Sequence, residues 1–331
     1  MSPVEMESLV SAPFSSQITT RRTVLRGGVA ALTAMLAGTS LVACGNDKSA
    51  LSGNQTNTSD YDQIIAAAPT ADASTVDGNA WAKKIKDRGQ LLTGGSDSGP
   101  LFSMKDPSTG KITGFDAGMA QMLSHYITGK PDGPISLTVT TVDTRETVIE
   151  NGTVDTVIAT YSITPQRAKK VAFAGPYYRS GDGVMVKADN TDITGVKDLG
   201  GKNVVTQQGS TTADRIKQVA PDAKVTLLPD DAQCLQALKT GRADAYVIDE
   251  SILVSNASAD KTLKVVGEPF SNDFYGIGVT RDDPQAKAFV NAWLEKVFAD
   301  GSWAKMWKAT VGTVVTGDAP QPPKIGSADG S

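Results

Sequence analysis

The sequence is poor in the residues on which most catalytic and metal sites depend. It contains one histidine, His125, and two cysteines, Cys44 and Cys234. It contains neither a Gly-x-Ser-x-Gly motif nor a phosphate-binding P-loop. These absences disfavour a histidine-dependent catalytic triad, a histidine or cysteine metal cluster and a P-loop nucleotide site. We therefore expect no metal ion, no other cofactor and no enzymatic activity.

One long hydrophobic run is present, at residues 27–43, and it follows the segment TRRTVLR at residues 20–26. The run falls short of the roughly 20 residues that span a bilayer, which argues against the alternative of a transmembrane helix. It ends in LVACG at residues 41–45. The whole segment resembles a twin-arginine export signal with the lipobox of bacterial lipoproteins, although the general secretory route stays open. The resemblance implies that residues 1–43 are removed and that Cys44 carries the lipid.

The rest of the chain carries no strong charge of either sign. The full sequence has 32 Lys and Arg against 36 Asp and Glu, a net charge of −4, which argues against nucleic acid as a partner. The chain after Cys44 exceeds the usual size of a single core, so we expect two lobes. Residues 44–79 are rich in Ser, Asn, Asp, Thr and Ala and are predicted to form a flexible stalk, with a short helix at residues 61–68. Residues 313–331, with three prolines, are predicted to be a disordered tail.

Between these ends, short apolar strands alternate with amphipathic helices, a pattern typical of mostly parallel sheets covered by helices. Apolar residues between Phe115 and Tyr126 recur at helical spacing and indicate a core face. The second half is predicted to contain strands near residues 204–206, 225–228 and 244–248, with helices over 211–219 and 231–240. The last part is predicted to contain a strand over 277–280 and helices over 284–300 and 302–310.

The most informative stretch is VIATYSITPQRAKKVAFAGPYY at residues 157–178. The hydroxyls of Thr160 and Ser162 alternate along a predicted extended chain, so both are expected to face one cleft. Arg167 follows across a turn, and its planar guanidinium suits a carboxylate through two parallel hydrogen bonds. The alternative is that Arg167 is a solvated helix charge beside Lys169 and Lys170.

This stretch resembles the α-amino-acid site of the extracytoplasmic solute-binding proteins of ABC importers, in the polar amino-acid family (family 3). It is most similar to that family's glutamate-binding lipoproteins, over roughly residues 90–310. The resemblance implies a two-lobed α/β periplasmic-binding-protein fold of type II, with two lobes joined by two hinge strands. Lobe 1 would comprise residues 80–183 and 276–312, and lobe 2 residues 184–275. It also implies a monomer that is anchored outside the cell membrane and delivers L-glutamate to an ABC permease.

The family pattern assigns further ligand contacts in lobe 2. Ser210 and Thr211 follow Gly209 between a strand and a helix, where the helix N-terminus favours an anion. The alternative is that they only cap the helix. Asp249 ends an apolar strand, at the edge where open α/β lobes bind ligands, and matches the family's ammonium-binding acid. The alternative is that it caps the helix beginning at Glu250.

The resemblance assigns selectivity for the ligand side chain to Arg145. Glutamate and aspartate binders of the family carry an arginine at this spacing before Arg167, and it contacts the distal carboxylate of the ligand. A salt bridge of Arg145 with Glu146 or Glu150 on the helix surface is the alternative. Arg179 is a secondary candidate. The loop at residues 96–102 lacks the covering aromatic of many relatives, so glutamine and aspartate stay open as ligands.

Two other functions stay open, a tethered sensor and a fold-sharing cyclohexadienyl or arogenate-type dehydratase that would use Asp97 or Asp273 as an acid. Cys234 stands where glutamate-binding relatives often place one half of a disulfide, but Val205 occupies the position of its partner. We therefore expect no disulfide and a buried Cys234.

Overall fold

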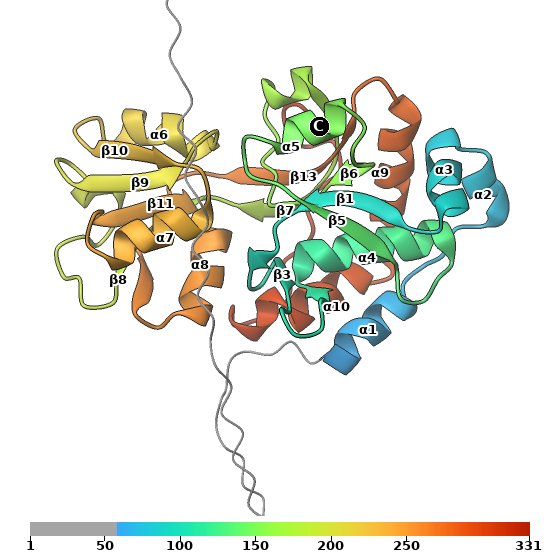
Figure 1. Cartoon of the computed structure of the whole chain (residues 1–331), viewed down its shortest axis with the longest axis horizontal. Coiled ribbons are helices and arrows are strands. Elements are labelled where there is room, and N and C mark those ends of the chain that lie inside the picture. The colour runs from blue at the N-terminus through green and yellow to red at the C-terminus, as the bar shows by residue number, and fades with distance from the viewer. Residues whose placement is uncertain (1–57) are drawn as a thin grey trace, which may run out of the picture. The chain divides into compact units, whose positions relative to one another are not determined.

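The computed structural model describes residues 58–331. The predicted export signal, Cys44 and the first part of the predicted stalk lie outside the described residues. Two five-stranded sheets, each flanked by helices, form two lobes that share their crossing strands (Figure 1). The predicted two-lobed α/β fold is confirmed.

Lobe 1 is built on a sheet with the strand order β5-β1-β6-β13-β7. β1 pairs in parallel with β5 and β6, whereas β13 runs antiparallel to β6 and β7. The strands are β1 (Leu91–Gly95), β5 (Ile135–Val139), β6 (Thr156–Val157), β7 (Val171–Ser180) and β13 (Asp273–Thr280). The helices are α3 (Ala80–Arg88), α4 (Phe115–Thr128), α5 (Arg145–Glu150), η1 (Arg167–Lys169), α9 (Pro284–Ala299), α10 (Ser302–Ala309) and η3 (Val311–Thr313). A small separate sheet holds β2 (Ser98–Gly99), β3 (Ser103–Lys105) and β4 (Ile112–Thr113).

Lobe 2 repeats the plan with the strand order β10-β9-β11-β8-β12. β9 pairs in parallel with β10 and β11, and β8 runs antiparallel to β11 and β12. The strands are β8 (Asp182–Lys187), β9 (Asn203–Gln207), β10 (Lys224–Leu228), β11 (Ala245–Asp249) and β12 (Leu263–Val266). The helices are η2 (Val196–Asp198), α6 (Thr211–Val219), α7 (Asp231–Lys239) and α8 (Glu250–Ala259).

The two lobes are joined by β7, which leads into β8, and by β13, which returns from lobe 2. These segments pair from Asp273 opposite Ser180 to Thr280 opposite Val171. Gly181 separates β7 from β8, and a Cβ there would meet the carbonyl oxygen of Ser271 at 2.2 Å. The two crossings therefore approach so closely that only glycine fits between them.

Helix starts follow the capping chemistry of the sequence. The side chains of Ser210 and Asp230 accept hydrogen bonds from backbone amides in the first turns of α6 and α7. Asp283 caps α9 in the same way, and Pro284 occupies its first turn, where no amide hydrogen is needed. These caps explain why the starts of α6, α7 and α9 coincide with the predicted ones.

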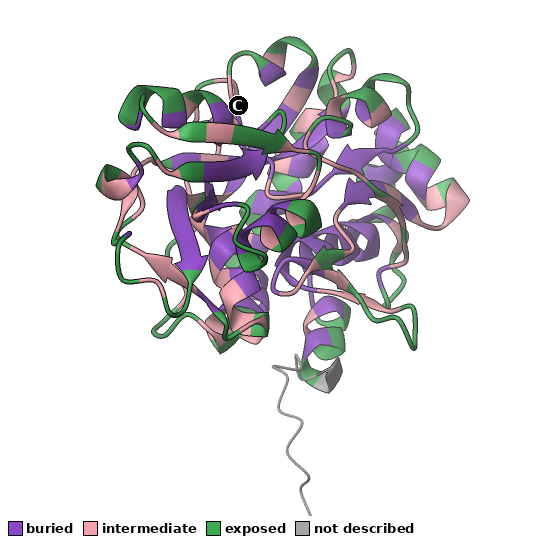
Figure 2. Ribbon diagram, turned by 60° about the vertical axis from the view of Figure 1, so that its left-hand side comes forward, coloured by how far each residue is buried: buried purple, intermediate pink, exposed green. Residues whose placement is uncertain are grey.

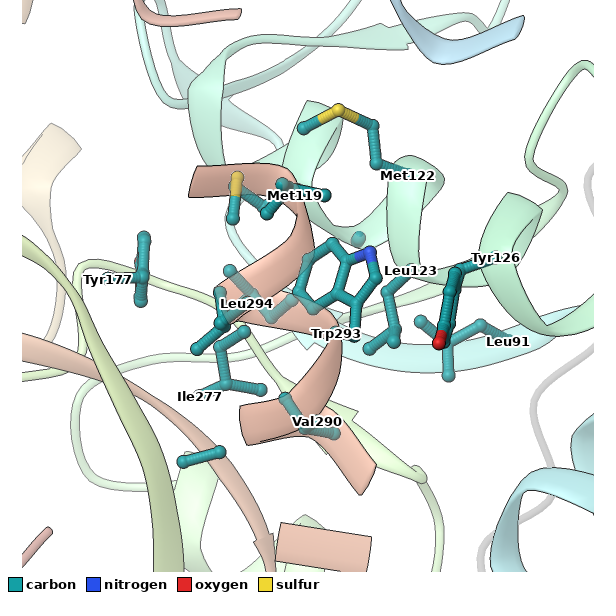
Figure 3. Close-up of a cluster of buried hydrophobic side chains, with 14 of the residues drawn as sticks. Leu91, Met119, Met122, Leu123, Tyr126, Tyr177, Ile277, Val290, Trp293 and Leu294 are labelled. Atoms are coloured by element: carbon teal, nitrogen blue, oxygen red, sulfur yellow. The ribbon is translucent and has the colours of Figure 1, made fainter. Parts of the chain in front are cut away.

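The core of lobe 1 lies between α4, α9 and the first sheet. Figure 3 shows Trp293 of α9 between the side chains of Leu123 and Leu294, with Met119 and Met122 of α4 beside them. Buried residues fill the interior, whereas exposed residues lie mainly on the outer helices and loops (Figure 2). In α4, 13 residues from Phe115 to Ile127 are buried. The prediction that the α4 methionines are core residues is confirmed.

The structure corrects the predicted flexible stalk from Thr58 onward, whereas the short helix predicted at residues 61–68 is confirmed. Residues 58–79 contain α1 (Thr58–Ala66) and α2 (Ala73–Asp77), and Tyr61, Ile65 and Ala68 are buried in the core of lobe 1. Tyr61 and Ile65 are four residues apart and share one face of α1, and Ala68 follows just after the helix ends. The overall composition of the segment is polar, but these few apolar side chains are enough to pack it against lobe 1.

His125 is buried by the same N-terminal segment. Its two ring nitrogens lie 3.1 Å and 2.7 Å from the carbonyl oxygens of Ala68 and Lys130. His125 is 4% exposed, because α4 is packed on more than one side. The histidine connects the segment after α1 to α4.

The predicted disordered tail is also corrected. Residues 314–331 have irregular backbone, but Ala319 and Ile325 pack on the core of lobe 1. The Gly326 amide donates to the carbonyl of Gly175 on β7 at 2.9 Å, and Ala328 packs on the other face of the lobe. Proline prevents regular hydrogen bonding but not packing, so the composition misled the prediction.

Within residues 58–331, each helix is too short or too polar to cross a membrane. Cys234 is buried as predicted and shares an apolar cluster with Val205. Burial raises the pKa of its thiol to about 12, so it is a packing residue rather than a nucleophile.

We predict that Tyr61→Ala destabilises the protein, since its ring is fully buried and its hydroxyl donates to Gln121 at 2.7 Å. Loss of a buried aromatic side chain lowers the free energy of unfolding by about 3–5 kcal/mol. Urea denaturation measures this change. Gln63→Ala, an exposed position on the same helix, is the matched control and should stay within about 0.5 kcal/mol of wild type. Equal stability of the two variants would restore the stalk interpretation.

Candidate ligand-binding cleft

A cavity of about 330 Å³ lies between the two lobes. Lobe 1 contributes the loop at residues 96–103, the segment 139–145 and the turn at residues 159–160. Lobe 2 contributes Gln207 at the end of β9 and the facing parts of α7 and α8. The cavity is of the size that holds a small molecule, and it lies where strands end and helices begin.

The predicted site residues divide into two groups around this cavity. Arg145 and Thr160 line it directly. The other predicted contacts lie outside its lining, namely Ser162, Arg167, Ser210, Thr211 and Asp249. Arg167 and Asp249 each influence the pKa of Arg145, so both lie close to it. The second group therefore lies next to the cavity, where lobe 1 meets lobe 2.

Arg145 is buried in the cavity wall and only partly paired. One terminal nitrogen donates to the carbonyl of Ala159 at 2.9 Å, and the guanidinium lies 4.1 Å from the centroid of the Tyr161 ring. Its buried Nε has no hydrogen-bond partner. Burial and the neighbouring Arg167 lower its pKa to about 10, which leaves it charged at neutral pH. A buried cation with an unused donor is suited to receive an anion.

The surface salt bridge considered for Arg145 does not form. Glu146 instead bonds to Lys170 at 3.0 Å and approaches Nε of Arg167 at 3.6 Å. Glu146 therefore compensates the second arginine and leaves Arg145 without a carboxylate in direct contact.

Arg167 is 8% exposed, which excludes the solvated helix charge considered for it. Its terminal nitrogens donate to the carbonyl of Ser162 at 2.8 Å and, across the cleft, to the carbonyl of Gly209 at 3.1 Å. A guanidinium has five N–H groups, so donors remain beyond these two bonds. Arg167 thus bridges the lobes and still has N–H groups that can donate to an anion.

The predicted alternation of Thr160 and Ser162 is not observed. Thr160 has φ 45°, in the left-handed region, so the chain is not extended there. Its hydroxyl donates to the carbonyl of Ala159, and its amide donates to the carboxylate of Asp116. Ser162 is buried and forms a β-bridge with Tyr275. A left-handed non-glycine residue is strained by about 1–3 kcal/mol, and such residues gather at functional sites.

Ser210 and Thr211 lie at the N-terminus of α6, as the sequence predicts. The Ser210 hydroxyl accepts the Ala213 amide at 3.2 Å, so the capping alternative describes this contact correctly. Gly209 has φ 74°, and a Cβ there would meet the Asp143 carboxylate of lobe 1 at 2.0 Å. A glycine is required at this crossing point.

Asp249 ends β11 and is 5% exposed. It makes no side-chain bond to the helix that follows, which removes the helix-cap alternative. Its carboxylate accepts the Tyr275 hydroxyl at 2.9 Å, and that hydroxyl also contacts Ser251 at 2.6 Å. Burial, followed by the charges of Asp182 and Asp273, raises its pKa to about 7. A cation near Asp249 would relieve this excess of negative charge.

Asp182, Asp249 and Asp273 bring carboxylate oxygens within 4.8 Å of one another. Arg215 donates to both Asp182 and Asp273, so a guanidinium already serves two of the three acids. Asp273, one of the acids considered for a dehydratase, is therefore held at the hinge, while Asp97 lines the cavity. Arg179 donates to Asn272 at the hinge and does not line the cleft.

Sequence reasoning missed several cavity residues, most of them acidic. Asp116 and Asp231 line the cavity together with Asp230, Gln207 and Asn256. The Tyr246 hydroxyl and the Asn256 amide both donate to Asp231 at 2.9 Å. Gln207 was detectable as a polar residue at the end of a strand, whereas the acids had the appearance of ordinary helix-start residues. The cavity thus presents one guanidinium and several carboxylates, which suits a ligand with charges of both signs.

Comparisons with known proteins agree with this geometry. The sequence profile of the family described as bacterial extracellular solute-binding proteins, family 3, matches residues 91–312. The chain is 36% identical over 253 residues to a glutamine-binding protein of Geobacillus stearothermophilus, which covers 76% of this chain and 91% of the relative. It is 30% identical to the glutamate-binding protein GluB of Corynebacterium efficiens, with 88% and 92% coverage.

Solved structures show the same fold. A mutant of ArgBP from T. maritima superposes with a TM-score of 0.63 at 27% identity, over 70% of this chain and 99% of that one. The ancestral amino acid-binding protein AncCDT-1, a precursor of cyclohexadienyl dehydratase, superposes with a TM-score of 0.62 at 31% identity, over 69% and 97%.

We predict that the unliganded protein loses stability as the pH rises toward neutrality, partly through Asp249. Its pKa is raised from 3.8 to about 7, so between these values the folded chain binds more protons than the unfolded chain. The contribution is fully present below about pH 4 and is lost as the pH rises through about 7. Asp249→Asn should therefore flatten the dependence of the free energy of unfolding on pH, measured by urea denaturation between about pH 5 and 7.5.

Asp282→Asn, at an exposed position, is the control and should keep the wild-type slope. The same slope in all three proteins would mean that Asp249 is charged throughout this range.

Proposed function

Because the chain belongs to the bacterial extracellular solute-binding proteins of family 3, we propose that it binds a polar amino acid between its two lobes. We propose that it delivers this ligand to an ABC importer as a non-enzymatic monomer. The relatives named above are binding proteins for glutamine and glutamate, which supports an amino acid of this size. The favoured ligand is L-glutamate, with glutamine and aspartate as alternatives.

The observation that carries the proposal is the buried, under-paired guanidinium of Arg145 in the wall of the interlobe cavity. In the proposed complex it receives the side-chain carboxylate of glutamate. A neutral glutamine would leave this charge less compensated, and that difference is the basis of selectivity.

The head group of the ligand is assigned to the residues beside the cavity. Arg167 would hold the α-carboxylate together with the Ser162 and Thr211 hydroxyls and the N-terminus of α6 with Ser210. Asp249 would hold the ammonium group, and its excess of neighbouring negative charge favours that cation. Thr160 donates its hydroxyl proton to Ala159, so it offers an acceptor to the ligand and not the donor expected from the sequence.

Binding in this scheme requires the lobes to part and close again. The Gly209 carbonyl, which now accepts from Arg167 across the cleft, would give way to the ligand carboxylate. The crossing strands around Gly181 provide the hinge. Closure excludes water and strengthens the charged hydrogen bonds.

Localisation forms a separate part of the proposal. Cys44 would carry a lipid that anchors the protein to the outer face of the cell membrane, where the transmembrane subunits of the permease are reached. The export signal and lipobox pattern at residues 20–45 supports this assignment.

The ligand assignment predicts a loss of selectivity in Arg145→Ala. Removal of one partner of a buried charged pair costs roughly 2–5 kcal/mol, so the Kd for glutamate should rise about 30-fold or more. The Kd for glutamine should rise by about 3-fold or less, since no full charge pair is lost. Isothermal titration calorimetry with glutamate, glutamine and aspartate measures both changes.

Two further variants separate this role from general damage. Arg167→Ala should weaken all three ligands alike, because the α-carboxylate is common to them. Arg179→Ala, at the hinge and outside the cavity, should leave them unchanged. Equal losses of glutamate and glutamine in Arg145→Ala would assign Arg145 a structural role, and the absence of binding by the wild type would refute the proposed function.

The anchor predicts that Cys44→Ala moves the protein from the membrane fraction to the soluble fraction, because the acylated residue is missing. Cell fractionation with immunoblotting measures the distribution. Cys234→Ala, at the buried cysteine, should stay with the membranes. Membrane retention of Cys44→Ala would exclude lipidation at this position as the anchor.

A further inference from the structure

Asp116, the second residue of α4, is 1% exposed and forms part of the cavity wall. One carboxylate oxygen accepts the Tyr177 hydroxyl at 2.7 Å, and the other accepts the Thr160 amide at 2.7 Å. Both oxygens are therefore acceptors, which is the pattern of an ionised carboxylate. Burial raises its pKa to about 7, against the effect of these bonds and of Arg145.

The peptide group between Ala159 and Thr160 is held from both ends. Its N–H donates to Asp116, and its C=O accepts from Arg145 at 2.9 Å and from the Thr160 hydroxyl at 2.8 Å. A carboxylate at the donor end and a guanidinium at the acceptor end polarise the same amide, so each bond strengthens the other.

Thr160 would not adopt this geometry without such contacts. In the described part of the chain it is the one non-glycine residue with positive φ. Relaxation of Thr160 to negative φ would turn the peptide plane and move the Ala159 carbonyl away from Arg145. That carbonyl is the hydrogen-bond acceptor that fixes Arg145, because its Nε is unpartnered.

We propose that Asp116 is a positioning residue of the cleft, which orients Arg145 through the peptide group between Ala159 and Thr160. The inference rests on the proposed function, since it concerns the residue to which side-chain selectivity is assigned. Asp116 forms no hydrogen bond with Nε of Arg145. It acts by holding the peptide group whose Ala159 carbonyl accepts from Arg145. The cleft therefore obtains its anion preference from a pair of opposite charges separated by one amide.

The test compares Asp116→Asn with Tyr177→Phe in the full chain. The Asn variant can accept the Thr160 amide only as a neutral group and places an NH2 group against one of the two donors. We expect the Kd ratio of glutamine to glutamate to fall about 5-fold or more in Asp116→Asn. Tyr177→Phe removes the other bond to the same carboxylate, so it should lower the melting temperature and leave the ratio unchanged.

A double-mutant cycle tests the path through Thr160. Glycine adopts positive φ without strain, so Thr160→Gly needs less support from Asp116. In that background Asp116→Asn should change the ligand ratio by about 2-fold or less. An unchanged ratio in Asp116→Asn, or an equal change in both backgrounds, would overturn the proposal.

A measurement without substitution of Asp116 covers the case in which Asp116→Asn does not fold. The Thr160 amide proton should resonate downfield in 15N–1H spectra and should move upfield in Arg145→Ala, as the shared amide loses its polarisation. An unshifted resonance would overturn the proposal. This readout needs no ligand, so it remains decisive even where the wild type binds none of the amino acids and the proposed function fails.

Discussion

The antiparallel pairing of β7 with β13 is the contact on which the rest of the structure depends. These strands belong to the sheet of lobe 1, and their far ends enter lobe 2. Tyr178 of β7 stacks on Tyr275 of β13 with ring centroids 5.6 Å apart. The Tyr275 hydroxyl then reaches Asp249 in lobe 2, while Ser162 bridges to the Tyr275 backbone from the cleft side. A change in the angle between the lobes therefore acts directly on groups assigned to the ligand.

The two arginines beside the cleft differ in how far neighbouring groups neutralise and hydrogen-bond their guanidinium charges. Glu146 and two carbonyls serve Arg167, whereas Arg145 has one carbonyl, one aromatic face and an unpaired Nε. On the lobe 2 side, Arg215 donates to Asp182 and Asp273, whereas the carboxylate of Asp249 accepts from the Tyr275 hydroxyl. Arg145 and Asp249 are therefore left without an opposite charge in direct contact, and this is the basis of the roles proposed for them.

Much of the fold was predictable because it follows from local chemistry. The caps at Ser210 and Asp283 mark helix starts, and the apolar spacing in α4 marks its core faces. The packing of the N-terminal helix and the tail was not predictable from composition, because it depends on surfaces contributed by α4, α10 and β7. Arg167 was singled out by its guanidinium chemistry and by resemblance, and Arg145 by resemblance alone. Asp116 was missed because its partners Thr160 and Tyr177 lie 44 and 61 residues away in the sequence. The positive φ of Thr160 is also unpredictable, because threonine rarely adopts this conformation.

The packing of residues 314–331 beside β7 affects how readily the protein associates with other chains. β7 is an edge strand of its sheet, so the amides and carbonyls on its outer side could otherwise pair with a strand of another molecule. The Gly326 amide takes one of these carbonyls, and irregular, proline-containing backbone cannot itself extend the sheet. Residues 314–331 thus cover part of this edge and leave less of it open to strand addition by another chain. Affinity tags and fusions are for that reason better attached elsewhere on this molecule.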